Sequence, residues 1–285
     1  MTDRSISEED ATVAVTRDGA VIRLSQNRPR ARNAQNRQML DTLDAKLREA
    51  IDDDSVRVII IAGEGEHFSA GHDLKQAQAE RADFSVEQRW DFESRRYFDY
   101  CLRVWDCPKP VIAEVQGACI AGAFMLANLC DLVIASDDAY FSDPVAHTLA
   151  TASIEVLIHP WVMGLRRAKQ MLYTGERIDA AEAYRIGMVN EVVPRAALPA
   201  ETMALAQRIA AAPPFALRLL KRSLNRGAEA QGMKLALQAH FETHQLSHVS
   251  QEFQQVRARG LAGAIADARS HGDARPASDS RPDAG

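Results

Sequence analysis

Residues 57–74 read RVIIIAGEGEHFSAGHDL and contain the segment that decides the fold. The run from Arg57 to Ala62 has the isoleucine-rich composition of a buried strand. Before it, residues 12–26 alternate apolar and polar side chains around Asp18-Gly19, which is a strong hairpin signal. Between the hairpin and this strand, residues 35–52 carry apolar side chains at helical spacing. The order strand, strand, helix, strand is one ββα unit.

The same pattern returns further along the chain. A second apolar strand is predicted over residues 111–115, a helix over 121–128, and two more strands over 132–135 and 139–141. Strands that alternate with helices form a largely parallel sheet with helices packed on it. The sequence therefore predicts an α/β fold.

The remaining segments are predicted to be mostly helical. Residues 75–106 are strongly charged at first and become helical near Trp90, so we interpret their start as a mobile, solvated loop that feeds a helix. After Gly175 the chain carries the start and stop signals of several helices, with predicted helices over 180–186, 198–211 and 216–225 and a long run over 231–268 broken at Gly260.

These patterns divide the chain into four parts. We expect an N-terminal tail over residues 1–11, a core over 12–196, a C-terminal helical region over 197–269, and a disordered tail over 270–285. The last segment is rich in Pro, Ser, Asp and Gly and has no apolar residues that could anchor it.

Composition excludes several classes of function. The chain has 285 residues, of which 46% are hydrophobic, and a formal net charge of −5, so no overall positive field attracts nucleic acid or an anionic membrane. Its four cysteines form no CxxC pair, as is typical of free thiols in a reducing compartment. The N-terminus is acidic where a signal peptide would be basic and apolar. We expect a cytoplasmic protein without a metal site.

Two turns rich in small residues follow predicted strands, at residues 68–74 and 116–124. In the second turn, Ala121-Gly122-Ala123 opens a helix whose first N–H groups are unpaired, and glycine lets a ligand approach the backbone. Two such donors would form an oxyanion hole for an enolate or a tetrahedral oxyanion. Spacing alone is equally compatible with tight packing turns. No glycine-rich phosphate-binding motif follows any predicted strand, which disfavours a generic nucleotide-binding protein.

Four segments together, residues 27–34, 57–74, 110–122 and 175–190, resemble the enoyl-CoA hydratase/isomerase (crotonase) family. The resemblance extends over roughly residues 12–260. It implies a crotonase-like ββα spiral with a C-terminal helical oligomerisation region, which binds an acyl-CoA thioester. It also assigns the two oxyanion-hole donors to the backbone N–H groups of His72 and Gly122, while the imidazole of His72 could face either the pocket or solvent.

The resemblance also indicates where coenzyme A binds. Arg28, Arg30, Arg32 and Lys75 supply local positive charge in an acidic protein, which suits the phosphates of CoA. Any one of these side chains taken alone is more typical of a solvated surface than of a phosphate contact. The family pattern predicts that the CoA contacts are Arg30, Ala31, Ala70, His72, Asp73 and Lys75. No cofactor is expected to be bound permanently, since the substrate carries the coenzyme as a thioester.

The chain departs from the family pattern at the acid/base positions. Hydratases of the family use two glutamates, and the matching positions here are Met125 and Val145. Neither side chain can transfer a proton. We nominate Glu155 as the replacement, because other branches of the family place a carboxylate further along the chain. Nearby Asp143, His147 and His159 are alternatives, and all of these groups are also compatible with ordinary structural roles.

Two functions are compatible with this pattern. The leading hypothesis is an enoyl-CoA hydratase/isomerase-type enzyme that stabilises a thioester enolate and uses non-standard acid/base residues. The alternative is a catalytically silent acyl-CoA-binding homologue. In either case we expect a homotrimer or a dimer of trimers, because the C-terminal helices of an isolated chain would expose apolar surface that the family buries between subunits.

Overall fold

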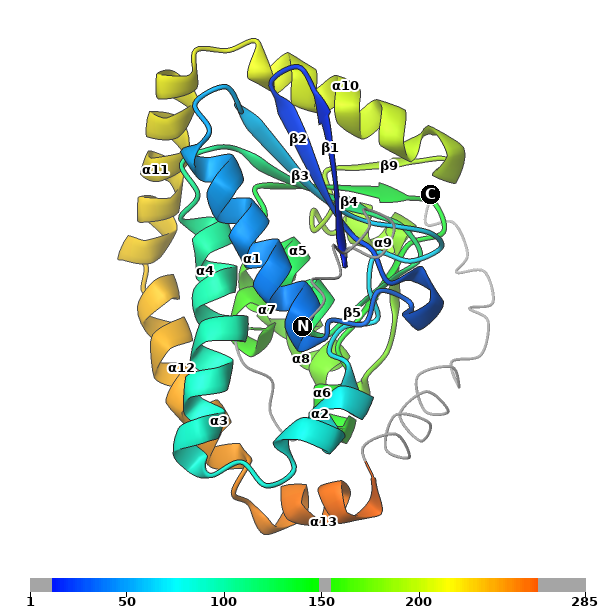
Figure 1. The fold of residues 1–285 in the computed structure, drawn as a ribbon, viewed down its shortest axis with the longest axis vertical. Coiled ribbons are helices and arrows are strands. Elements are labelled where there is room, and N and C mark those ends of the chain that lie inside the picture. Colours follow the sequence, from blue (N-terminus) through cyan, green and yellow to red (C-terminus); the bar gives the residue numbers. More distant parts are fainter. Residues whose placement is uncertain (1–11, 149–154, 261–285) are drawn as a thin grey trace, which may run out of the picture.

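The computed structural model describes residues 12–148 and 155–260. The predicted tails over 1–11 and 270–285 lie outside these residues, and so does the segment over 149–154. Figure 1 shows a twisted sheet with helices on both of its faces and a column of C-terminal helices along one side.

The main sheet has six strands in the order β1-β2-β3-β4-β6-β9. Strand β1 pairs antiparallel with β2 through the predicted hairpin, and every later pair in this sheet is parallel. The bounds are β1 Val13–Asp18, β2 Val21–Gln26, β3 Val58–Gly63, β4 Val111–Val115, β6 Leu132–Ser136 and β9 Glu191–Val193. The apolar runs of the sequence therefore form the expected parallel core.

A small second sheet lies at the end of the main sheet. It has the order β5-β7-β8, with β5 Ala118–Ile120 parallel to β7 Tyr140–Ser142, and β7 antiparallel to β8 Ile178–Asp179. Two residues separate the end of β4 from the start of β5. The second small-residue turn, residues 116–124, therefore includes a strand of this small sheet.

The described part of the chain contains thirteen α-helices. Several begin with a side-chain cap, such as Asn36 before α1 and Ser85, which forms a capping box, before α3. Their bounds are α1 Arg37–Asp52, α2 Leu74–Arg81, α3 Val86–Glu93, α4 Tyr100–Trp105, α5 Gly122–Leu129, α6 Val145–Thr148, α7 Glu155–Met163, α8 Leu165–Thr174, α9 Ala180–Arg185, α10 Leu198–Ala210, α11 Pro214–Ala230, α12 Met233–Ser247 and α13 Gln251–Arg259. Short turns η2 Pro29–Ala31 and η4 Arg195–Ala197 are 3-10 helices, and η3 Ser94–Asp99 is a π-helix.

The two faces of the main sheet have different coverings. Helix α10 packs its buried residues Leu198, Ala206 and Ala210 against one face, where it meets Ile60 and Ile112. Helices α1, α4 and α5 pack against the opposite face and form the larger core. In Figure 1, α10 crosses the top of the sheet, and α11 and α12 continue down the left side.

Two predicted segments differ from the structure. Residues 75–106 are helical almost throughout, because Asp73 caps α2 and Ser85 caps α3, so the predicted loop at their start is wrong. The long C-terminal run is interrupted before Gly260: α12 ends at Ser247, and Ser250 caps the new helix α13. In both segments a polar side chain accepts a backbone N–H and thereby fixes where a helix begins, and apolar periodicity alone does not show that position.

Candidate active site

Two turns at the ends of strands lie side by side at the centre of the candidate site. Ser69 donates its backbone N–H to the carbonyl of Ala118 at 3.0 Å, and Ile120 donates its N–H to the carbonyl of Ser69 at 3.2 Å. Gly71 follows with φ of 83°, and a Cβ at this position would lie 2.5 Å from the carbonyl oxygen of Ile120. Only glycine fits such a close approach at positive φ, so the two turns are fixed at short range.

The two donors predicted from the sequence lie on these adjoining turns. Gly122 is the first residue of α5, so its N–H has no partner within the helix. The N–H of His72 likewise has no partner in any hydrogen bond between the described residues. A Cβ on Gly71, the neighbour of His72, would lie only 3.4 Å from the nitrogen of Gly122. The structure therefore brings together the two turns that carry the predicted oxyanion-hole donors.

The residue before Gly122 is held in a strained conformation. Ala121 has φ of 48° and ψ of −116°, a region that residues with a Cβ rarely occupy. Hydrogen bonds fix it on both sides, since its N–H donates to the carbonyl of Ser142 at 3.0 Å and its carbonyl accepts the N–H of Met125 at 2.8 Å. Strain of this kind persists where surrounding contacts impose it, and it occurs frequently at functional sites.

The imidazole of His72 lies over Gly122. A Cβ on Gly122 would be 2.2 Å from Cε1 of His72, and the ring centroid lies 4.1 Å from that of Tyr97. The residue as a whole is partly exposed, but its Nδ1 is buried and has no hydrogen-bond partner. Desolvation, assisted by the positive charge of Arg81, lowers the pKa of His72 to about 3. The ring is therefore neutral at pH 7 and faces the turn.

The arginine-rich loop over residues 28–34 packs against the first turn. Ala70 donates its N–H to the carbonyl of Arg32 at 2.9 Å, and Nη1 of Arg28 lies 2.9 Å from Oδ2 of Asp73. These contacts join the loop that carries Arg30 and Ala31 to the turn that carries Ala70, His72 and Asp73, and Lys75 follows that turn in α2. Binding of coenzyme A by Arg30, Ala31, Ala70, His72, Asp73 and Lys75 stays a prediction.

The environment of these residues differs. Arg30, Ala31 and Lys75 are exposed, whereas the carboxylate of Asp73 is engaged within the protein. Its Oδ1 accepts the N–H of Gln76 at 3.1 Å as the cap of α2, and its Oδ2 pairs with Arg28. Asp73 therefore positions the loop and the helix, while Arg30 and Lys75 leave positive charge at the surface.

Comparison with known proteins decides the family. The profile described as "Enoyl-CoA hydratase/isomerase" matches residues 16–263. The chain belongs to this family.

Individual relatives agree with this assignment. "Putative enoyl-CoA hydratase EchA13" from Mycobacterium tuberculosis is 40% identical over 248 residues, which is 81% of this chain and 78% of that protein. The crystal structure of an enoyl-CoA hydratase/isomerase from Xanthobacter autotrophicus Py2 superposes with a TM-score of 0.82 at 36% identity, over 93% of this chain and 99% of that chain. A probable enoyl-CoA hydratase from Mycobacterium smegmatis gives a TM-score of 0.78 at 46% identity, over 83% of this chain and 94% of that chain. The α/β fold of this chain, with its helical C-terminal region, is thus the crotonase fold.

Met125 and Val145, the residues that the sequence analysis matched to the hydratase glutamates, are both buried. Met125 lies in α5 and is 1% exposed, and Val145 begins α6 and is 4% exposed. Glu155 is the first residue of α7, but its side chain lies outside the described part of the structure, so its role as a base stays a prediction. Glu155 and His159 both lie on α7, and Pro160 lies within that helix.

A buried polar network lies behind the second turn. Nε2 of His159 is 2.9 Å from Oδ2 of Asp143, and both side chains are fully buried. Nδ1 of His159 is 3.0 Å from Nδ2 of Asn128, and Phe124 stacks on the ring at 4.5 Å between centroids. Burial raises the pKa of Asp143 to about 8. By contrast His147 is exposed, and its Nε2 bonds the carbonyl of Tyr173 at 2.9 Å.

A second polar cluster was missed by sequence reasoning. Glu93, His244 and His248 are all buried and converge from α3 and the end of α12. Two histidines four residues apart in a predicted helix were a signal for it, but nothing in the sequence indicates that Glu93 lies opposite them. Among the residues that the structure describes, no helix has the length and apolar composition needed to cross a bilayer.

Proposed function

We propose that this family member is an acyl-CoA enzyme that holds the thioester carbonyl oxygen between the backbone N–H groups of His72 and Gly122. The observation that supports this most strongly is the pair of unpartnered N–H groups on two turns that Gly71 locks together. Both lie beside the N-terminus of α5, whose dipole favours negative charge.

These donors suit the formation of an enolate. When a base removes the proton from the carbon next to the thioester carbonyl, the electron pair of the broken C–H bond moves toward that carbonyl, and its oxygen gains negative charge. Hydrogen bonds that strengthen as this charge develops lower the barrier, and each preorganised donor contributes about 100- to 1,000-fold in rate. Return of a proton to the same carbon completes exchange. Where the acyl chain has a double bond between the β- and γ-carbons, the electron pair extends over it, and return of the proton to the γ-carbon completes isomerisation.

The proton must be moved by a group other than the two hydratase glutamates. Met125 and Val145 cannot hold and activate water, so we propose that hydration of crotonyl-CoA is weak or absent. Glu155 remains our nominated base. The Asp143–His159 pair is a second candidate for two reasons. Asp143 follows Ser142, whose carbonyl accepts a hydrogen bond from the N–H of Ala121, and the pKa of Asp143, about 8, is close to neutral pH.

A catalytically silent acyl-CoA-binding protein is the second candidate function. Met125 and Val145 favour it, because their side chains are apolar and buried and cannot transfer a proton, whereas the turns proposed to bind the carbonyl are present. In either function we propose that Arg30 and Lys75, with Ala31 and Ala70, receive the CoA moiety, and that the protein acts in the cytoplasm. The substrate carries the coenzyme as a thioester, so we propose that no organic cofactor is bound permanently.

One pair of measurements tests the proposal. The protein is incubated with crotonyl-CoA while the absorbance of the double bond is followed, and with butyryl-CoA in deuterated water while deuterium at the α-carbon is measured. We expect α-exchange without an ordinary rate of hydration. Binding without either reaction would identify the silent homologue, and the absence of both binding and chemistry would refute the acyl-CoA function.

A further inference from the structure

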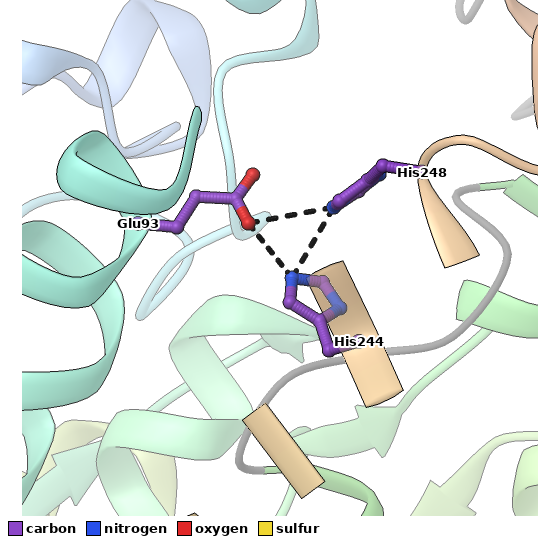
Figure 2. Close-up of side chains that lie close together, drawn as sticks. All are labelled: Glu93, His244 and His248. Atoms are coloured by element: carbon purple, nitrogen blue, oxygen red, sulfur yellow. Dashed lines mark hydrogen bonds and ion pairs between the residues drawn. The ribbon is translucent and has the colours of Figure 1, made fainter. Parts of the chain in front are cut away.

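The cluster formed by Glu93, His244 and His248 is built from segments that are distant in the sequence. Glu93 ends α3, His244 lies in the last turn of α12, and His248 is the residue that caps that helix. Figure 2 shows the three side chains pointing toward one another. Among the residues that the structure describes, this is the one group of three His, Cys, Asp or Glu side chains whose ligand atoms all lie within 4.8 Å.

The distances within the cluster match the edges of a metal coordination shell. Oε2 of Glu93 is 2.9 Å from Nε2 of His244 and 3.4 Å from Nε2 of His248, and the two nitrogens are 3.3 Å apart. In a tetrahedral zinc site with bonds of about 2.0–2.1 Å, neighbouring ligand atoms are about 3.3 Å apart. The three atoms therefore form a triangle close to one face of such a tetrahedron.

Hydrogen bonding alone leaves this cluster incompletely satisfied. Three nitrogens converge on the single oxygen Oε2 of Glu93, because Nε2 of Gln245 also donates to it at 2.7 Å. Oε1 of Gln245 and Nδ1 of His248 are buried, in residues only 5% and 7% exposed, and neither atom has a hydrogen-bond partner within residues 12–148 and 155–260. Buried polar atoms without partners are rare, and they indicate either a bound ligand or a cost in stability. Reversing the Gln245 amide would present its oxygen to the same point.

We propose that Glu93, His244 and His248 bind a divalent transition-metal ion of the Zn²⁺ type. Two imidazoles and one carboxylate are a ligand set that zinc accepts, with the fourth position left for water or for the oxygen of Gln245. The ion would link α3 to α12 across a sequence separation of 151 residues. It would thus fasten the C-terminal helices to the helices that follow the first active-site turn.

The site lies one layer away from the candidate active site. Tyr97 contacts the ring of His72 and lies 5.9 Å from Phe92, the residue before Glu93. Phe241, one turn before His244, packs against Phe98 at 5.0 Å. A bound ion would therefore stabilise the aromatic side chains of Phe92, Tyr97, Phe98 and Phe241, which pack behind His72, without touching the thioester. The inference does not depend on the proposed reaction.

The test uses the full-length protein stripped with a chelator. After dialysis against Zn²⁺ and removal of free ion, elemental analysis should find one Zn²⁺ per chain. The melting temperature should rise by roughly 5 °C when the free Zn²⁺ concentration exceeds the Kd about 100-fold. Glu93→Gln, His244→Ala and His248→Ala should each reduce Zn²⁺ affinity by at least about 10-fold, in line with loss of a direct ligand. His240→Ala, one turn earlier in α12, is the matched control and should bind Zn²⁺ like the native chain.

A spectroscopic measurement on the native protein covers the case in which the variants fail to fold. X-ray absorption at the zinc edge should show nitrogen and oxygen ligands with the scattering of two imidazoles. Fewer than one tightly bound Zn²⁺ per chain, a zinc shell without two imidazoles, or the same affinity in the ligand variants and the control would each overturn the proposal. The cluster would then be a hydrogen-bonded packing contact.

Discussion

Removal of the N–H of Gly122 is the most direct test of the oxyanion hole. Any side chain at this position meets His72, because a Cβ would lie 2.2 Å from Cε1 of the imidazole. We therefore design the experiment in a His72→Ala background, which removes the ring but keeps the backbone N–H of residue 72. Gly122→Ala then adds a Cβ and retains the N–H, whereas Gly122→Pro removes the N–H.

The expected loss follows from the number of donors. Loss of one preorganised donor costs about 100- to 1,000-fold in rate, or about 2.7–4 kcal/mol of transition-state stabilisation. Proline is compatible with the first position of a helix, but the residue before it prefers extended backbone, and Ala121 has φ of 48° and ψ of −116°. Circular dichroism must therefore show that the variant is folded. Replacing the amide by an ester at this bond removes the N–H without a ring and controls for the strain.

Two assays measure the effect. Exchange at the α-carbon of butyryl-CoA reports the chemistry, and the infrared stretch of a ¹³C-labelled thioester carbonyl reports the hydrogen bonds even if the protein only binds. The carbonyl stretch of bound substrate should lie at lower frequency with Gly122→Ala than with Gly122→Pro. If the folded proline and ester variants keep both the exchange rate and the stretch within error of the alanine variant, the assignment of Gly122 is wrong.

Three further predictions concern the rest of the molecule. Crotonyl-CoA hydration should be weak in the native protein. If Glu155 is the base, Glu155→Gln should reduce the rate of α-exchange by about 100-fold or more, measured as deuterium incorporation in samples quenched at successive times. Burial raises the pKa of Asp143 in the folded state, so the contribution of this group to folding stability should be fully present below the usual pKa of aspartate and be lost as pH rises through about 8. Thermal melts of the native protein should therefore lose more stability over this range than those of Asp143→Asn, and equal pH profiles would contradict this. Sedimentation should show a trimer or hexamer, because Phe215, Leu220 and Leu224 of α11 are 65%, 61% and 74% exposed in one chain. Leu224→Arg should weaken this assembly. A clean monomer of the native protein at micromolar concentration would contradict the prediction.

The hairpin, the strands β3, β4, β6 and β7, and the two turns were predictable because their signals are local, whereas the short strands β5, β8 and β9 were not predicted. An Asp-Gly pair between alternating residues fixes the hairpin of β1 and β2, and the isoleucine-rich run of β3 is buried at every position. Gly71 and Gly122 mark the turns for a physical reason that the structure explains, since a Cβ at either residue would clash with the opposite turn or with His72.

The polar clusters were not predictable, because each depends on contacts between residues far apart in the chain. The sequence placed Asp143 and His159 in one neighbourhood, but it did not show that Asn128 and Phe124 of α5 enclose them. Glu93 gave no sign of meeting His244, because burial of a glutamate at the end of a helix depends on the element that packs over it. The direction of the His72 ring was open for the same reason.

The arrangement around α5 shows how proton chemistry could be separated from the oxyanion hole in this chain. The first residue of the helix offers its N–H to the candidate carbonyl site, while Phe124 and Asn128, four residues apart, hold His159 on another part of its surface. Met125 lies between these two functions and is apolar, so it cannot pass a proton from one to the other. The connection between them runs through Ser142, whose carbonyl accepts the N–H of Ala121 at 3.0 Å and which is joined to Asp143 by a peptide bond. A change in the charge of the buried pair would therefore act on the oxyanion turn through the position of the strained Ala121, and an effect of Asp143→Asn on the thioester carbonyl stretch would indicate a positioning role even where proton transfer belongs to Glu155.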